Sequence, residues 1–167
     1  YKSELAKNLS ALASTVVTDG DSKSKGREYI TEARELTNRV VAEHPNNTAL
    51  WIDKRTIDYN LSKIDPSQNL ELLRTAGRLK DLAPTDASIQ YDVALVYLYL
   101  EKNKDAVSQL EKVVDLKKDY REAVIMLGRT YIKVGETEKA TLLLQNWLKR
   151  NPSDSEAEEL LKTLLTG

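Results

Sequence analysis

The sequence predicts an all-α fold, an α-solenoid of antiparallel helical hairpins with about nine helices. The first observation is composition: the 167 residues include only 6 Gly and 4 Pro, and Ala, Leu, Glu and Lys dominate the segments between them, which is typical of stacked helices. Apolar residues also recur at helical spacing within those segments. Finally, the C-terminal half repeats a pattern every 34 residues, a period typical of helix–turn–helix arrays.

The period of 34 links equivalent positions of successive hairpins, both at the ends of the hairpins and where their two helices pack together. Pro84 and Pro152 lie two periods apart, and Lys118 stands midway between them. The same step joins the following pairs: Ala94 and Gly128, Tyr97 and Tyr131, Ala106 and Ala140, Leu110 and Leu144, and Val113 and Trp147. We therefore expect helices at about 86–101 and 104–117, and again at about 120–134 and 137–150.

The paired residues have a physical role in such a hairpin. The small residues allow two helices to approach closely, and Tyr97 and Tyr131 are expected to fill the wedge between neighbouring hairpins. The apolar residues of each second helix form one buried stripe. A proline then ends the hairpin, because the residue before it is driven out of the α region.

Residues 124–131, Val-Ile-Met-Leu-Gly-Arg-Thr-Tyr, resemble the tetratricopeptide pattern W-x2-L-G-x2-Y with one apolar exchange, and Ala140, Leu144 and Pro152 continue that pattern. The resemblance implies a right-handed superhelix with repeats at 87–120 and 121–154. A further amphipathic helix, at about 154–166, is expected to cap the stack as segment 155–167. Ser153 with Glu156, and Ser155 with Glu158, are both candidate capping boxes at its start.

The upstream segment 46–86 is a longer and degenerate repeat. Pro45 precedes Pro84 by five residues more than the period, and the excess is assigned to the connection from Lys63 to Asn69. Trp51 occupies the tryptophan position of the pattern. However, the residues at the Leu, Gly and Tyr positions are charged: Lys54, Arg55 and Asp58. Helices are still expected at about 47–62 and 68–82.

Segment 1–45 is expected to be a divergent hairpin, which completes one domain over residues 1–167. Residues 26–43 and 2–17 predict its two helices, the latter with Leu5, Leu9, Leu12 and Val16 on one face. The polar residues 18–25 between them predict a loop.

One helix is apolar on nearly every face. In residues 89–100, Tyr91, Leu95, Leu98 and Tyr99 recur at helical spacing beside the packing positions. The resemblance implies that this face lines a concave groove that binds a peptide or helix of a partner. The corresponding groove positions in the neighbouring first helices are Ile52, Tyr59, Ile125, Arg129 and Lys133. The alternative is that these side chains fill a tightly wound superhelix or contact a neighbouring hairpin.

The groove composition predicts the kind of segment that it binds. The Lys, Asn and Arg clamp by which some tetratricopeptide domains hold a C-terminal carboxylate is absent, because the matching positions carry Ile52, Thr56, Asp92, Glu122 and Met126. An apolar or amphipathic segment fits better, with Arg129 and Lys133 meeting an acidic flank.

The residue types of catalytic and cofactor sites are missing or isolated, so we expect no enzyme, cofactor or metal. There is no Cys, and His44 is the only histidine, too few for a usual zinc site or a catalytic triad. Asp19-Gly20-Asp21 lacks the ligand spacing of a calcium loop, and no Gly-rich phosphate loop occurs. The net charge of −1 predicts no nucleic-acid partner.

A second resemblance concerns residues 1–85. Residues 1–14, the string His44-Pro45-Asn46-Asn47-Thr48-Ala49-Leu50-Trp51 and the lengthened connection after it are similar to tetratricopeptide tails of bacterial O-antigen ligase or polymerase-like membrane proteins. This implies a soluble domain of a larger protein, tethered to a membrane by segments outside this chain. A start at Tyr1 without a signal core favours an excised fragment. The side of the membrane is not predicted.

Two functional hypotheses remain open from the sequence. The first is a protein-interaction scaffold that holds a peptide or helix of a partner in the groove. The second is a self-associating assembly module, a homodimer, or the accessory domain of a membrane-bound glycan ligase or polymerase.

Overall fold

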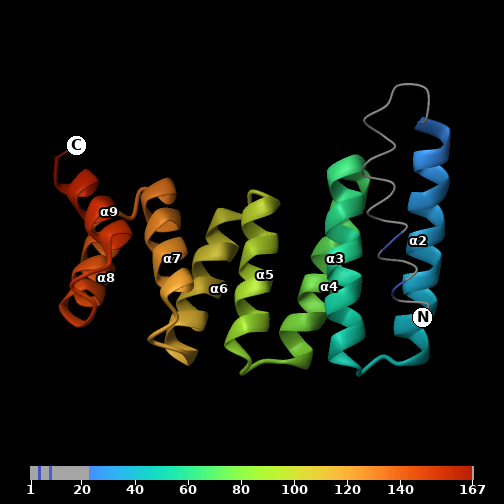
Figure 1. Cartoon of the computed structure of the whole chain (residues 1–167), viewed down its shortest axis with the longest axis horizontal. Coiled ribbons are helices and arrows are strands. Elements are labelled where there is room, and N and C mark those ends of the chain that lie inside the picture. Colours follow the sequence, from blue (N-terminus) through green and yellow to red (C-terminus); the bar gives the residue numbers. More distant parts are fainter. Residues whose placement is uncertain (1–3, 5–7, 9–22, 167) are drawn as a thin grey trace. The chain divides into compact units, whose positions relative to one another are not determined.

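A computed structural model describes residues 4, 8 and 23–166 of the chain, and this part is entirely helical apart from its connections (Figure 1). A 3-10 turn, η2, covers Pro66–Gln68. The α-helices of the described residues are α2 Lys23–Glu43, α3 Thr48–Ile64, α4 Asn69–Leu82, α5 Ala87–Tyr99, α6 Asn103–Leu116, α7 Arg121–Val134, α8 Thr137–Arg150 and α9 Ser155–Thr166. The all-α prediction is confirmed, as is the sequential packing of helical hairpins.

The predicted helices agree with the observed ones to within about three residues at each end. The expected helix at 2–17 and residues 18–22 of the expected loop fall largely or wholly outside the described residues. The expectation of a loop is wrong for residues 23–25, which belong to α2. Among the described residues, no helix combines the length and the apolar character needed to cross a bilayer.

The chain divides into two compact units, Tyr1–Pro84 and Thr85–Gly167, which are described separately. The organisation proposed from the sequence, one domain with boundaries near 45, 86, 120 and 154, stays a prediction.

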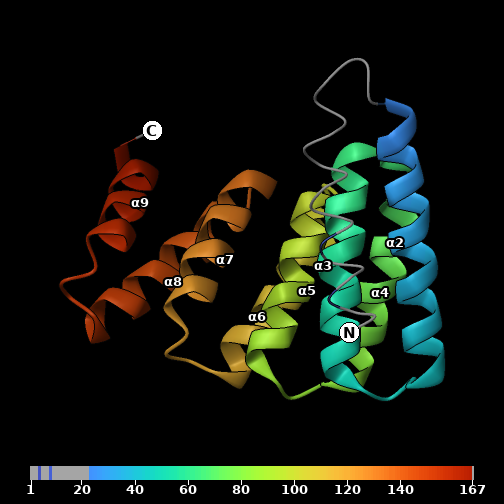
Figure 2. The ribbon, with the colours of Figure 1, turned by 45° about the vertical axis from the view of Figure 1, so that its right-hand side comes forward.

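In the first unit, α3 packs between α2 and α4 (Figure 2). Ile30 and Ala33 of α2 meet Ile57 and Leu61 of α3 in a buried cluster. The sequence assigns the five extra residues of this repeat to the connection, which is only partly correct. Helix α3 has 17 residues, against 13 in α5 and 14 in α7, so most of the surplus lengthens this helix and the rest lies in the connection that contains η2. The Asp65 carboxylate accepts a hydrogen bond from the Ser67 amide at 3.0 Å and so caps this turn.

The α3–α4 hairpin contains a buried ionic cluster at the positions where the repeat pattern is broken. The Lys54 side chain is 2% exposed, and its ammonium lies 3.0 Å from both Asp58 Oδ2 and Glu71 Oε1. The Thr75 hydroxyl donates to Asp58 Oδ2 at 2.6 Å. Burial raises the pKa of Asp58 against the opposing effect of Lys54. Burial would also raise the pKa of Glu71, but its hydrogen bond from Lys54 lowers it.

In the second unit, the period of 34 reappears as repeated backbone geometry. The Lys102 amide donates to the Tyr97 carbonyl at 2.8 Å, and the Glu136 amide donates to the Tyr131 carbonyl at the same distance. Glu101, with φ of 56°, occupies the left-handed place that Gly135, with φ of 81°, has in the next repeat. Both hairpins thus turn in the same way, and glycine is the residue best suited to this conformation.

The small residues allow close packing of helices, as expected. Ala94, Ala106 and Ala140 are fully buried. A Cβ atom at Gly128 would lie 3.3 Å from Leu144 Cδ2, a close contact that would require the Leu144 side chain to shift. Tyr131 is buried in the cluster that joins α5, α6, α7 and α8, and its hydroxyl lies 2.6 Å from Glu111 Oε1.

The predicted capping boxes of α9 are wrong. The cap is Asp154, whose Oδ1 accepts a hydrogen bond from the Ala157 amide at 3.3 Å. Glu156 instead forms ion pairs with two arginines of α7. An aspartate at the N-cap position satisfies the free amide groups directly, which leaves the glutamate side chain available for another contact.

Candidate functional site

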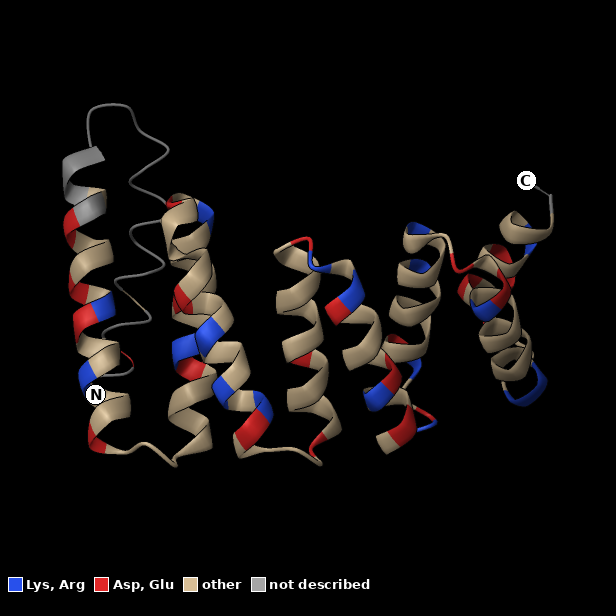
Figure 3. Ribbon diagram, turned by 180° about the vertical axis from the view of Figure 1, so that it is seen from behind, with Lys and Arg blue, Asp and Glu red and all other residues tan. Residues whose placement is uncertain are grey.

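Helix α5 is the most apolar of the described helices, and the candidate site is built on its partly exposed residues. Figure 3 shows this helix almost without charge; Asp92 is its one charged residue. Tyr91 and Leu95 are half-buried, and Tyr99 is 36% exposed. Leu98 packs against the core of the unit, so its side chain serves stability as well.

Tyr120, which the sequence pattern does not place on this face, also belongs to it. The period aligns Tyr120 with Asp86 and Asp154, which cap α5 and α9 with their carboxylates, but the Tyr120 side chain makes no such bond. Its ring lies 5.1 Å from the Tyr91 ring, tilted by 46°, a favourable aromatic pairing. An aromatic residue at a capping position is the signal that could have revealed it. We call Tyr91, Leu95, Tyr99 and Tyr120 the tyrosine face.

The Tyr91 hydroxyl stays neutral in this setting. Burial raises the pKa of Tyr91, and the nearby Tyr120, Glu122 and Asp92 raise it further. The side chain therefore offers apolar area together with a neutral hydrogen-bonding group.

Helix α7 places a basic pair at the positions that correspond to Leu95 and Tyr99 one period earlier. Arg129 and Lys133 are exposed and one turn apart. Ile125, the third residue predicted on this helix, is 5% exposed and lies in a buried cluster with Leu144, Trp147 and Ala157. The accessible part of the site therefore lacks Ile125.

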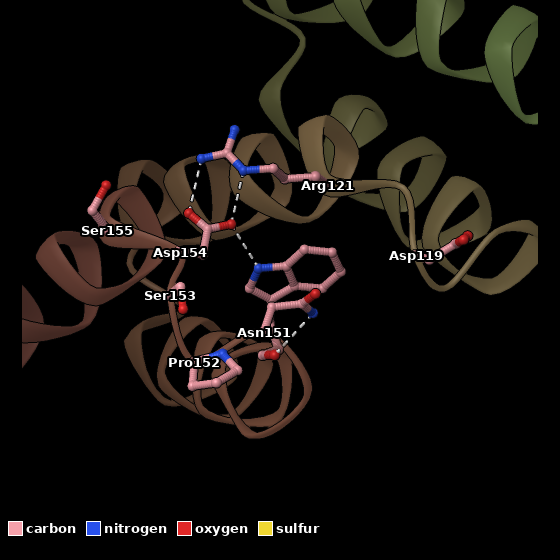
Figure 4. Close-up of a pocket in the computed structure, with 8 residues that line it drawn as sticks. Asp119, Arg121, Asn151, Pro152, Ser153, Asp154 and Ser155 are labelled. Atoms are coloured by element: carbon pink, nitrogen blue, oxygen red, sulfur yellow. Dashed lines mark hydrogen bonds and ion pairs between the residues drawn. The ribbon is translucent and has the colours of Figure 1, made fainter.

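The ion pairs between α7 and α9 centre on Arg121. Its Nε and Nη2 atoms each lie 2.8 Å from an oxygen of Asp154, as Figure 4 shows, and Trp147 Nε1 donates to the same carboxylate at 2.9 Å. Glu156 bridges two arginines: its Oε2 lies 2.8 Å from Arg121 Nη2 and its Oε1 lies 2.8 Å from Arg129 Nη2. Arg129 of the basic pair is thus joined to α9.

A shallow hollow of about 470 Å³ adjoins these contacts. Its lining residues come from the α6–α7 and α8–α9 connections and the adjacent helices: Asp119, Arg121, Trp147, Asn151, Pro152, Ser153, Asp154 and Ser155. Because Arg121 is already bound by Asp154 and Glu156, the hollow presents no guanidinium free of carboxylates.

We expect the Arg121–Asp154 contact to make stability depend on pH. The hydrogen bond from Arg121, with those from Trp147 and Ala157, lowers the pKa of Asp154 from 3.8 to about 2. The ionised carboxylate therefore stabilises the fold above about pH 4, and this stabilisation is lost as the pH falls from about 4 towards 2. Between pH 5 and pH 2, urea unfolding should show a loss about 1 to 2 kcal/mol larger for the wild type than for Asp154→Asn. Asp119→Asn is the control, and equal losses in wild type and Asp154→Asn would contradict the assignment.

The predicted groove residues of the first unit are Ile52 and Tyr59, and both are half-buried on α3. The Lys63 ammonium lies 5.4 Å from the centre of the Tyr59 ring. Trp51 belongs to a separate local contact: its indole nitrogen donates to the Pro45 carbonyl at 2.9 Å, and Arg78 donates to that carbonyl at 3.0 Å. These contacts hold the α2–α3 turn against α4.

Metal-binding geometry is absent from the part of the chain that the structure describes, where no three His, Asp or Glu side chains are grouped to hold an ion. His44 is exposed at the turn after α2, and Glu158 and Glu159 are exposed on α9.

The comparison with protein families agrees with this repeat geometry. Residues 97–164 match the family model described as "Tetratricopeptide repeat". Residues 97–164 of this chain therefore form a tetratricopeptide repeat region. Domains built from tetratricopeptide repeats are generally protein-interaction modules and are typically non-catalytic.

Several curated relatives share this type of repeat region. The chain is 32% identical over 114 residues to DnaJ homolog subfamily C member 3 of Bos taurus, a match that covers 60% of this chain and 23% of that protein. The counterpart from Gallus gallus is 36% identical over 97 residues, covering 52% of this chain and 19% of that protein. The chain therefore spans less than a quarter of the curated relatives that it matches.

Solved structures show the same tetratricopeptide fold. TTC0263, a thermophilic TPR protein of Thermus thermophilus, superposes with a TM-score of 0.60 at 18% identity, covering 94% of this chain and 79% of that one. MamA protein gives 0.64 at 16% identity, covering 93% and 80%. YrrB, described as "a TPR protein with an unusual peptide-binding site", gives 0.57 at 21% identity, covering 77% and 64%.

Proposed function

We propose that the second unit binds a peptide segment of a partner protein along the tyrosine face, with the basic pair Arg129 and Lys133 meeting an acidic residue of that segment. The observation that carries this proposal is the run of partly exposed, uncharged aromatic and aliphatic side chains on α5, continued by Tyr120. Leu95 and Tyr99 correspond by period to Arg129 and Lys133, so the apolar and basic residues occupy equivalent places on successive first helices of the repeats.

Tyrosine suits this role for a physical reason. It offers a large apolar surface with few rotamers to fix on binding, and its hydroxyl can remain hydrated. The peptide-binding site named in the description of YrrB belongs to a protein of the same fold and is consistent with this use of the repeat. Ile52 and Tyr59, in the first unit, stay predictions as partner contacts.

Random peptides displayed on phage and selected on the whole chain provide a direct test. We expect Tyr91→Ala and Tyr99→Ala each to weaken a selected peptide by about 1 to 2 kcal/mol, because each removes aromatic contact area. Titration calorimetry measures the affinities. Circular dichroism must show unchanged helicity, since Tyr91 also packs against the core.

The control is Leu142→Ala, which removes a 61% exposed leucine from α8. It should leave peptide affinity unchanged. The proposal fails if no peptide is selected, or if selected peptides bind equally well to the tyrosine variants.

Self-association is the second candidate, and it has its own surface. Leu142 and Leu165 are the most exposed leucines among the described residues, and a separate hollow is lined by Leu142 and Leu164. A strict monomer in light scattering at high concentration would remove this candidate. The accessory role beside a membrane-bound glycan ligase or polymerase stays a prediction from the sequence resemblance alone.

A further inference from the structure

We propose that Glu156 is an internal competitor for the partner's acidic residue: in the free chain its carboxylate occupies Arg129, and a bound acidic peptide takes its place. This inference rests on the proposed function and adds a regulation to the same surface. It concerns a peptide segment that carries Asp or Glu beside apolar residues.

The guanidinium of Arg129 already binds a carboxylate in the free chain. Its Nη2 lies 2.8 Å from Glu156 Oε1, and Arg121 Nη2 holds the other oxygen of the same carboxylate at 2.8 Å. The period places Arg129 at the position of Leu95, so this carboxylate lies next to the predicted path of the peptide. Glu156 thus provides within the chain the kind of group that the partner would provide.

Glu156 can leave Arg129 without releasing α9. The helix is anchored by Asp154, which binds Arg121 through both oxygens, accepts from Trp147 and caps α9. Ala157 is fully buried beneath it, and Leu160, Leu161 and Leu164 pack against the core. The anchoring contacts and the exchangeable contact therefore involve different side chains.

The exchange is also energetically accessible. Arg129 is exposed and Glu156 is partly exposed, and ion pairs in contact with water are weak. While Glu156 remains, it both occupies guanidinium donors and repels an incoming carboxylate. Removing its charge relieves both effects, so an acidic peptide should bind more tightly.

The experiment uses a phage-selected peptide with at least one Asp or Glu, and a copy in which those residues are replaced by Asn or Gln. We expect Glu156→Gln to tighten binding of the acidic peptide by about two- to five-fold in titration calorimetry and to leave the amide copy unchanged. Arg129→Gln should weaken binding of the acidic peptide, and adding Glu156→Gln to this variant should then leave the affinity unchanged.

Glu158→Gln is the matched control, because Glu158 has the same charge and also lies in the first turn of α9. It is exposed, and it should not change the affinity. If Glu156→Gln leaves acidic peptides unchanged, the competitor role is wrong and the proposed function stands. If peptides bind through the tyrosine face but are all non-acidic, the competitor role is wrong together with the part of the proposed function given to Arg129 and Lys133, and only the binding along the tyrosine face stands. If no peptide binds the tyrosine face, both proposals are overturned.

Discussion

Asp58→Ala is expected to destabilise the first unit by about 3 kcal/mol. The substitution removes the carboxylate that lies 3.0 Å from the Lys54 ammonium and accepts the Thr75 hydroxyl. Lys54 is left buried with Glu71 as its remaining ionic partner, and Thr75 loses its acceptor. Urea unfolding should show this loss through Trp51 fluorescence in a Trp147→Phe background, because the chain has two tryptophans and Trp51 then reports on the first unit alone.

The matched control restores the apolar pattern of the repeat. In Lys54→Leu/Asp58→Tyr both buried charges are gone, and replacing a buried ion pair by packed side chains is often neutral. We expect this double variant to recover most of the stability lost in Asp58→Ala. If Asp58→Ala alone lies within about 0.5 kcal/mol of the wild type, the ionic cluster has no part in stability.

Trp147→Ala is expected to cost about 3 to 5 kcal/mol in the second unit. The indole is 4% exposed and packs with Val124, Ile125, Leu144 and Ala157. Its removal leaves a cavity between α7, α8 and α9 and also deletes the hydrogen bond to Asp154. Hydrogen exchange measured by mass spectrometry should show faster exchange in α7 and α8, and urea unfolding followed by circular dichroism should show the loss.

Trp147→Phe separates the two contributions. It keeps an aromatic ring in the cluster but has no N–H to donate to Asp154, so we expect a loss well below that of Trp147→Ala. Trp51→Ala, in the other unit, should leave exchange in α7 and α8 unchanged. An alanine variant no less stable than the phenylalanine variant would contradict the packing described for this residue.

The helices were largely predictable because their signals are local. Small residues, apolar stripes and stop residues lie within a single helix or turn, so a period of 34 sufficed to locate α5 to α8 to within about two residues. The surplus of residues between Pro45 and Pro84 likewise predicts a longer repeat, but not that most of the surplus lengthens α3.

The candidate site was predictable only in part. Tyr91, Leu95, Tyr99, Arg129 and Lys133 could be assigned by counting along the period, because equivalent positions of a repeat face the same way. The joining of Tyr120 to the tyrosine face could not, since it depends on how the start of α7 lies against α5. The burial of Ile125 depends likewise on α9.

Local sequence patterns are not sufficient to predict the contacts that the charged residues make across helices. Hydrophobic periodicity and the residues that end helices already establish, from the sequence, the helices, the repeat and the surplus of apolar residues on α5. Only the tertiary structure shows that Glu71 and Thr75 of α4 join the Lys54–Asp58 pair of α3 in a buried cluster, that the Asp154 cap of α9 is held by Arg121, and that Glu156 binds Arg129. The physical reason is that an ionic contact forms between side chains brought together across helices, such as Arg121 and Asp154, 33 residues apart. The tetratricopeptide period can therefore be recognised in the sequence, whereas the pairing of charged side chains across helices is decided by how the helices pack.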